Sequence, residues 1–135
     1  MSISTTSKPP YYAVIFTSQH TGKEKEEYDE KSRTLESRKI LSKYPTRVPI
    51  IVEKHESCQF KNMNKKKYLS PKDLTMNSFI YEIRKRVELE PSQSLFVTVN
   101  NRLVSNTQTL GEIYENEADK DGFLYIIYTS ENTFG

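Results

Sequence analysis

The stretch Met76-Asn77-Ser78-Phe79-Ile80-Tyr81-Glu82-Ile83-Arg84-Lys85-Arg86-Val87 carries the clearest helical period in the chain. Its apolar residues fall on one helical face, because they recur at spacings of three, four, seven and eleven residues from the first. They are Met76, Phe79, Ile80, Ile83 and Val87. Basic residues follow near the C-terminal end, where cations suit the helix dipole. The segment is therefore predicted to be a helix that packs across a sheet.

Upstream, the sequence predicts two strands and a surface helix. Val48-Pro49-Ile50-Ile51-Val52 is rich in β-branched residues, and its proline should lie at the start of the strand or on an open edge. Lys65-Lys66-Lys67-Tyr68-Leu69 is a short second strand. Charged residues dominate 23–42, so this segment is expected to be a helix on the surface that ends before Pro45.

Downstream, the sequence predicts a hairpin, a short helix and a last strand. The runs 95–99 and 102–104 flank Asn100-Asn101, a turn-forming pair, which is typical of a hairpin. Thr109 and Glu112 have the spacing of a capping box. The apolar run 123–128 then predicts the final strand.

The order of elements predicts an α+β fold of the β-grasp, or ubiquitin-like, type, with an additional N-terminal helical segment. Ile50 to Val52 and Phe123 to Ile127 lack alternation, so both should be buried on two faces as neighbouring central strands. A helix crossing one face of such a mixed sheet completes the roll. The expected organisation is a flexible arm (1–22), a helical segment (23–43), a ubiquitin-like domain (44–130) and an exposed tail (131–135).

Composition limits the function classes. The length of 135 residues corresponds to about one domain. A net charge of +2, from 20 basic and 18 acidic residues, is too weak to imply a nucleic-acid partner by itself. Cys58 is the only cysteine, and neither a secretory signal nor a long apolar stretch is present, which favours a reducing, cytoplasmic setting. Membrane attachment would then require a partner or a covalent lipid.

The chain ends on Gly135, after a polar tether that follows the last predicted strand. Glycine has no Cβ, so the backbone can pass through a narrow channel, and its terminal acyl group is open to attack. Such an end suits a chain that is itself a substrate.

Several segments together resemble the autophagy-related protein 8 family of ubiquitin-like modifiers. The resemblance runs in order from about Tyr28 to Gly135. It rests on Lys43-Tyr44-Pro45-Thr46-Arg47-Val48-Pro49-Ile50-Ile51-Val52-Glu53-Lys54, Lys65-Lys66-Lys67-Tyr68-Leu69, Ile83-Arg84-Lys85-Arg86, Asp121-Gly122-Phe123-Leu124-Tyr125 and Glu131-Asn132-Thr133-Phe134-Gly135.

The resemblance implies a modifier and not an enzyme. Family members pass as thioesters from an activating to a conjugating enzyme and are joined to the amine of phosphatidylethanolamine, so Gly135 would be the site of lipid conjugation. A cysteine protease trims precursors and releases conjugates. No cofactor, metal or nucleic acid is implied. The protein would be cytoplasmic, and on the autophagosome membrane when lipidated.

The resemblance also implies a groove for receptor and adaptor peptides of the form aromatic, any, any, aliphatic, which add as a strand to an exposed edge at Lys65 to Ser70. The aromatic pocket would be formed by Glu36, Ile40, Pro49, Ile51, Lys67, Leu69 and Phe123. The aliphatic pocket would be formed by Tyr68, Pro71, Leu74, Phe79, Ile83 and Arg86. Arg47, Lys65 and Lys67 would attract acidic residues that flank such peptides.

The chain departs from the family pattern at four positions. Ser70 and Glu82 stand where aliphatic residues are usual, which predicts a shallower, more polar aliphatic pocket and a narrowed set of partners. Asp29 and Glu30 replace a common Pro-Phe pair, so the first turn of the N-terminal helix should be less firmly docked.

Tyr12-Ala13-Val14-Ile15 has the aromatic, any, any, aliphatic spacing itself. It could dock into the edge groove of its own chain or of a neighbour and compete with partners. Alternatively, this segment could be a strand that packs elsewhere, or a short apolar segment that makes only non-specific contacts.

Simpler interpretations compete with these. Phe79, Ile80 and Ile83 are first of all core residues, and the basic runs at 65–67 and 84–86 could be solvated surface. A nucleophile at Cys58 with His55 as base has no evident orienting carboxylate. His20 and His55 are too few for a metal site. The alternative function is a non-conjugated ubiquitin-like binding module in vesicle trafficking or cytoskeletal attachment.

Overall fold

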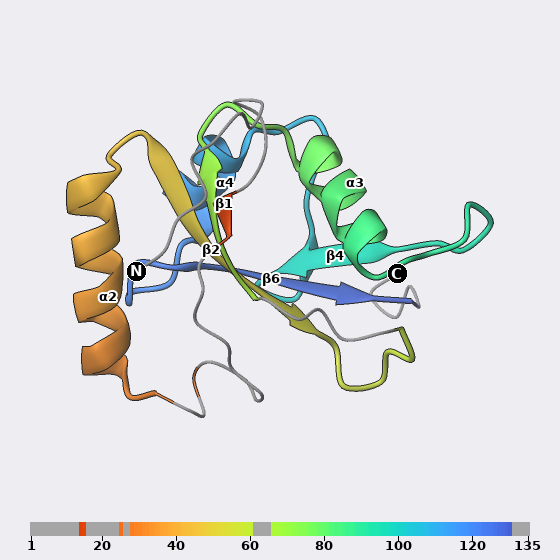
Figure 1. The fold of residues 1–135 in the computed structure, drawn as a ribbon, viewed down its shortest axis with the longest axis horizontal. Helices are drawn as coiled ribbons and strands as arrows, with labels where there is room; N and C mark the ends of the chain where they lie inside the picture. The colour runs from red at the N-terminus through yellow and green to blue at the C-terminus, as the bar shows by residue number, and fades with distance from the viewer. Residues whose placement is uncertain (1–13, 16–24, 26–27, 61–65, 131–135) are drawn as a thin grey trace.

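A six-stranded mixed sheet organises the computed structural model, which describes residues 14–15, 25, 28–60 and 66–130 (Figure 1). The strands follow the order β1-β3-β2-β6-β4-β5 across the sheet. They are β1 (Val14–Ile15), β2 (Arg47–Lys54), β3 (Lys67–Pro71), β4 (Phe96–Val99), β5 (Arg102–Leu103) and β6 (Leu124–Thr129). The described helices are α2 (Glu30–Lys43), α3 (Met76–Arg86) and α4 (Leu110–Glu117).

The two central strands, β2 and β6, run parallel, with Ile50 opposite Leu124 and Lys54 opposite Tyr128. This confirms the predicted α+β roll. The middle of β2 is buried on both faces, as expected. In β6 the expectation holds only in part, because Tyr125 and Ile127 are half-buried. The apolar cluster on that face reaches Tyr125 but does not include Ile127.

The helix α3 begins and ends almost where its sequence period predicts. Thr75 is the N-cap, and its hydroxyl accepts a hydrogen bond from the Ser78 N–H at 3.2 Å. Met76, Phe79 and Ile83 are buried against the sheet, which confirms their core role. On the same side α4 starts with the predicted capping box between Thr109 and Glu112.

The helix α2 begins later than the sequence suggested. Tyr28 and Asp29 precede it, and Asp29 is its N-cap, whose carboxylate accepts from the Ser32 N–H at 2.8 Å. That hydrogen bond lowers the pKa of Asp29. The first turn is also firmly docked, contrary to expectation, because Arg33 forms a buried ion pair with Asp121.

Two prolines lie inside strands. Pro49 is the third residue of β2 and is buried, and not at an edge or strand start as predicted. It is tolerated because it lacks only an N–H that would face β6, and pairing with β6 begins one residue later, at Ile50. Pro71 belongs to β3. The predicted hairpin is present, and Asn100 and Asn101 both have positive φ.

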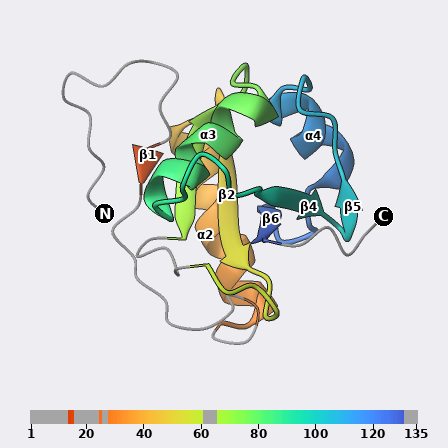
Figure 2. The ribbon, with the colours of Figure 1, turned by 90° about the vertical axis from the view of Figure 1, so that its right-hand side faces the viewer.

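The helices α2 and α3 lie on opposite sides of the central strands (Figures 1 and 2). The larger core cluster lies beneath α3 and α4 and includes Val48, Ile50, Tyr68 and Leu124. The smaller cluster faces α2 and consists of Ile40, Ile51, Leu69 and Phe123. Neighbouring residues of β2 and β3 thus alternate between the two clusters. Lys65, Gly135 and most of the predicted arm and tail lie outside the described residues.

Candidate functional site

The strand β3 divides its side chains between two apolar clusters. Leu69 belongs to the cluster facing α2, whereas Tyr68 belongs to the core beneath α3. Side chains alternate between the faces of a sheet along a strand, so Lys67 shares the face of Leu69 and Ser70 shares that of Tyr68. The residues predicted for two pockets therefore lie on opposite faces of one strand.

The structure brings the predicted aromatic-pocket residues together on the α2 side. Ile40, Ile51, Leu69 and Phe123 form one buried cluster, and Pro49 is buried beside them. Lys67 Nζ lies 2.7 Å from Glu36 Oε1.

Lys67 also lies over two aromatic rings. Its Nζ is 5.9 Å from the centroid of Phe123 and 5.5 Å from that of Tyr28, and the residue is only 2% exposed. The Lys67–Glu36 pair and Tyr28 therefore border this cluster closely. An aromatic side chain could enter only if Lys67 moved.

Most of the predicted aliphatic-pocket residues gather on the α3 side, whereas Pro71 belongs to neither apolar cluster. Tyr68 and Phe79 pack edge to face, with centroids 5.7 Å apart, and the Arg86 guanidinium lies 5.4 Å from the Tyr68 centroid. Burial raises the pKa of Tyr68. Pro71 is half-buried, and the other members, Leu74 and Ile83, belong to the main core.

Ser70 lies fully buried on this side, and no described residue forms a hydrogen bond with its Oγ. A buried hydroxyl without a partner is costly and therefore uncommon. Glu82 is half-buried and lies 3.5 Å from Lys85 Nζ on the surface of α3. It borders a hollow of about 540 Å³ on the outer face of α3. The polar character expected for the α3 side thus comes mainly from Ser70.

The edge expected to be exposed at β3 is covered. Val14 and Ile15 form β1, which pairs antiparallel with β3 and places Val14 opposite Leu69 and Ile15 opposite Tyr68. The residues Lys67 to Ser70 are all buried. This corrects the expectation of an open border. Tyr12 and Ala13, the other half of the four-residue motif, lie outside the described residues.

Of the basic residues predicted to attract acidic flanks, Arg47 is half-buried at the start of β2, and its Nη1 is buried without a hydrogen-bond partner in the described part of the chain. Lys67 is paired with Glu36, so its charge is already partly neutralised. Lys65 is not among the described residues.

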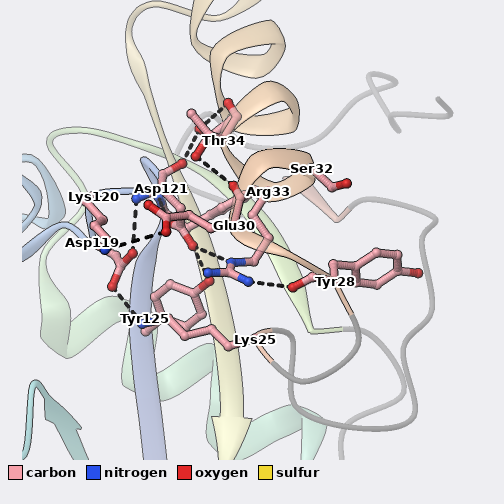
Figure 3. Close-up of polar contacts among 12 residues, drawn as sticks. Lys25, Tyr28, Glu30, Ser32, Arg33, Thr34, Asp119, Lys120, Asp121 and Tyr125 are labelled. Atoms are coloured by element: carbon pink, nitrogen blue, oxygen red, sulfur yellow. Dashed lines mark hydrogen bonds and ion pairs between the residues drawn. The ribbon is translucent and has the colours of Figure 1, made fainter.

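Sequence reasoning missed a polar network that joins α2 to the turn before β6 (Figure 3). Arg33 Nε donates to Asp121 Oδ2 at 2.8 Å, and the Tyr125 hydroxyl donates to the same oxygen at 2.6 Å. Lys25 Nζ reaches Asp119 Oδ1 at 2.6 Å and lies 4.5 Å from the Tyr125 ring centroid.

The network shifts its titratable groups. Burial and the hydrogen bond to Asp121 raise the pKa of Tyr125. Burial opposes the shift at Asp119, but its bonds to Lys25 and to the Asp121 N–H lower its pKa overall. A signal was present in the sequence, because Arg33, Ser37 and Ile40 share one helical face. This face carries an arginine and a serine beside Ile40, so a search for apolar periodicity alone does not detect it.

The Cys58 and His55 pair does not form a nucleophile and base. Cys58 is buried in the core, and its Sγ accepts from the Phe60 N–H at 3.4 Å. Nδ1 of His55 is engaged by the Ser57 hydroxyl at 2.8 Å. Within the described ranges, no cluster of at least three potential ligands is placed to hold a metal ion. No helix in the same part of the chain is both long and apolar enough to cross a membrane.

Comparison with known proteins identifies the family. The family model for the ubiquitin-like autophagy protein Atg8 matches residues 32–135. The chain belongs to the Atg8 family. Autophagy-related protein 8e of Arabidopsis thaliana is 47% identical over 107 residues, covering 79% of this chain and 88% of the relative. Autophagy-related protein 8 of Candida glabrata is 43% identical over 111 residues, covering 82% and 94%.

A solved Atg8 structure shares the fold. Plasmodium falciparum Atg8, in complex with a P. falciparum Atg3 peptide, superposes with a TM-score of 0.77 at 27% identity, covering 83% of this chain and 98% of that one. The predicted family is thereby confirmed, together with its ubiquitin-like fold. The match begins at residue 32, so the segment 1–22, which was predicted to be an arm, precedes the matched region.

Proposed function

We propose that this Atg8 protein is a modifier joined through Gly135 to phosphatidylethanolamine on autophagosomal membranes, where it recruits cargo receptors and adaptors. The proposal is supported by the family match, which extends to residue 135. Two acyl chains anchor a soluble domain stably, whereas a single myristoyl chain binds only marginally. The same reasoning makes the protein a substrate of the autophagy cascade and not its catalyst.

The chemistry proposed for Gly135 is acyl transfer. The amine of the lipid headgroup attacks the glycyl carbonyl of a thioester, an amide forms, and the thiolate of the conjugating enzyme leaves. Activating and conjugating enzymes would supply the thioester. A cysteine protease would hydrolyse the amide to return the protein from the membrane to the cytoplasm. The Atg3 peptide in the Plasmodium Atg8 complex supports binding of a cascade enzyme.

The second proposed activity is capture of aromatic, any, any, aliphatic peptides at β3. The main support for this activity is that Leu69 and Tyr68 belong to apolar clusters on opposite faces of the sheet. Two side chains three residues apart in an added strand also point to opposite faces. The peptide spacing therefore matches the geometry, with the aromatic residue on the α2 side and the aliphatic residue on the α3 side.

Acidic residues beside the peptide motif would be attracted mainly by Arg47. Among the residues that the structure describes, its Nη1 has no hydrogen-bond partner. Lys67 would contribute once its contact with Glu36 opened. Such charges act chiefly on the association rate and on specificity.

Reconstitution tests the conjugation. The protein is incubated with Atg8-activating and Atg8-conjugating enzymes, ATP and phosphatidylethanolamine liposomes, and the lipidated form is followed by gel shift. We expect the wild type and Cys58→Ala to be lipidated and the Gly135 deletion to remain unmodified. Lipidation of the glycine deletion would refute the proposal. Absence of lipidation in all forms would favour the non-conjugated binding module.

Peptide spacing tests the groove independently. A peptide with two residues between its aromatic and aliphatic positions is compared with one that has a single intervening residue. The shorter spacing places both side chains on one face, so one pocket stays empty and affinity should fall about 10- to 100-fold. A scrambled peptide of the same composition is the control. Equal binding of the two spacings would contradict strand addition at β3.

A further inference from the structure

The outer side of β3 offers hydrogen-bonding groups at alternate residues. The Val52 N–H donates to Lys66 O at 2.8 Å, and the Lys72 N–H donates to Thr46 O at 3.4 Å. Hydrogen-bonded pairs recur at every second residue of an antiparallel ladder. The N–H groups of Tyr68 and Ser70 therefore face β2. The N–H and C=O of Leu69 face outward.

The structure already fills this outward position. Val14 lies opposite Leu69, and β1 is hydrogen-bonded to β3. Because the groups of Leu69 point outward, Val14 and Leu69 form the hydrogen-bonded pair, and the N–H of Ile15 points away from β3. Figure 2 shows β1 at one border of the sheet, with β5 at the other.

We propose that Val14–Ile15 is an intramolecular occupant of the peptide site, which receptor peptides must displace from β3. This inference rests on the peptide-binding activity proposed above. The main-chain groups of Leu69 can pair with only one added strand at a time. Peptide binding and β1 docking are therefore mutually exclusive.

The extent of β1 makes it a displaceable occupant. β1 comprises two residues, whereas a peptide that spans both pockets contributes four or more residues. Its advantage is connectivity, because a segment of the same chain has an effective concentration on the order of millimolar. A weak strand can thus occupy the site in the free protein and still yield to a peptide that fills both clusters.

A second contact fixes the chain beyond the arm. Lys25 binds Asp119 and lies against Tyr125, ten positions after Ile15. The side-chain exposures of Lys25 and Asp119 are 50% and 23%, so the contact is partly open to water. By holding Lys25 on the folded domain, it limits the number of residues between β1 and this fixed point to nine. It thereby favours docking.

The size of the effect follows from occupancy. An arm docked for about nine-tenths of the time weakens the apparent affinity for a competing peptide about tenfold, because only the undocked tenth can bind. Partners that fill both pockets well would then be selected over weaker ones. A partner must therefore bind with an affinity high enough to displace β1 before it is recruited.

The backbone geometry provides a matched pair of variants in the full-length protein. Val14→Pro removes the N–H that faces Leu69 and should release β1. Ile15→Pro removes an N–H that points away from β3, which an outer strand tolerates. The readout is amide hydrogen exchange by NMR. Leu69 should exchange at least several-fold faster in Val14→Pro alone, while Tyr68 and Ser70 keep their protection from β2.

Peptide affinity is measured on the same three proteins. We expect Val14→Pro to bind an aromatic, any, any, aliphatic peptide several-fold to about tenfold more tightly than the wild type. Ile15→Pro should match the wild type. Equal affinity in all three, with binding intact, would overturn the role of the arm alone. Failure of every form to bind would overturn the proposed peptide function as well.

Dilution separates an intramolecular occupant from a strand supplied by a second molecule. Protection of the Leu69 amide should be independent of protein concentration if β1 belongs to the same chain. Its loss on dilution would overturn the intramolecular assignment. An unchanged Leu69 exchange rate in Val14→Pro would overturn the occupancy itself.

Discussion

Arg33 and Asp121 form a buried ion pair across 88 residues of sequence, with Nε and Oδ2 2.8 Å apart. Asp121 is fully buried and Arg33 is 7% exposed. The carboxylate also accepts hydrogen bonds from the Phe123 N–H at 2.9 Å and the Tyr125 hydroxyl at 2.6 Å. Together with the contact between Glu36 and Lys67, this pair links α2 to the sheet through polar groups.

Removing the cation alone should be strongly destabilising. Arg33→Met leaves the Asp121 carboxylate buried without its counter-ion, which should lower the free energy of unfolding by about 3–5 kcal/mol. The double variant Arg33→Met with Asp121→Asn should recover part of the loss, because the buried charge is gone. Urea unfolding measures both. Arg38→Met, at an exposed position of the same helix, is the control, and an equal loss there would contradict the ion-pair argument.

Tyr125→Phe should change the stability at neutral pH and its dependence on alkaline pH. Loss of the hydroxyl donor to Asp121 should cost about 1.5–3 kcal/mol at pH 7. Tyr81→Phe, at an exposed position, should cost nothing measurable at that pH.

The alkaline effect follows from the raised pKa of Tyr125. An unfolded tyrosine ionises near pH 10. The folded state holds the proton to higher pH, so its stabilising effect is complete below about pH 10 and is lost as pH rises toward the folded pKa. The wild type should therefore lose stability more steeply than Tyr125→Phe above about pH 10. Parallel curves in urea unfolding across this range would contradict the assignment.

Gly122→Ala should disrupt the turn that carries Asp121. Gly122 has a φ of +92°, and a Cβ there would lie 2.3 Å from Ser37 Oγ. The backbone strain alone should cost about 1–3 kcal/mol. Adding Ser37→Gly removes the clash but not the strain, so the double variant should lose less than the sum of the single ones in thermal unfolding. Strictly additive losses would show that the two residues do not meet.

Ser70→Val should stabilise the fold and alter peptide choice. Removing a buried hydroxyl without a partner avoids its desolvation cost of about 1–3 kcal/mol, part of which the larger side chain could offset by crowding. On the α3 side, a more apolar pocket should favour peptides with Leu or Ile at the aliphatic position by about 1–2 kcal/mol. Competition binding tests this, with Ser70→Thr as the variant that keeps the hydroxyl. An unaltered preference would refute the role of Ser70.

The parts of this fold that could be predicted are those whose signal is local. The apolar face from Met76 to Val87 is complete within one segment, and α3 begins and ends where it indicates. The capping box at Thr109 and the two asparagines of the hairpin are also local signals.

Long-range polar contacts were not predictable in the same way. Arg33 and Asp121 each resemble ordinary surface charges, and only the fold brings them together. The start of α2 was placed too early because the charged residues before Asp29 have good helix propensity, while the cap decides the boundary.

The candidate site was also predictable only in part. The pocket residues came from the family resemblance, and the structure shows that Leu69 and Tyr68 lie on opposite faces, which is the geometry that the proposed peptide spacing requires. The arm motif was visible in the sequence, and docking into the edge groove was one of two interpretations that its side-chain spacing left open. Side-chain spacing specifies which residues match a pocket, whereas strand pairing depends on main-chain groups that every residue shares.

The sheet ends on each border in a two-residue strand, β1 beside β3 and β5 beside β4. Short outer strands protect natural proteins from edge-to-edge aggregation. Release of β1 exposes the longer β3 to any other extended chain, including a second copy of this protein. Access to ligands and colloidal stability are therefore opposed, and preparations lacking the arm should self-associate at concentrations that the intact protein tolerates.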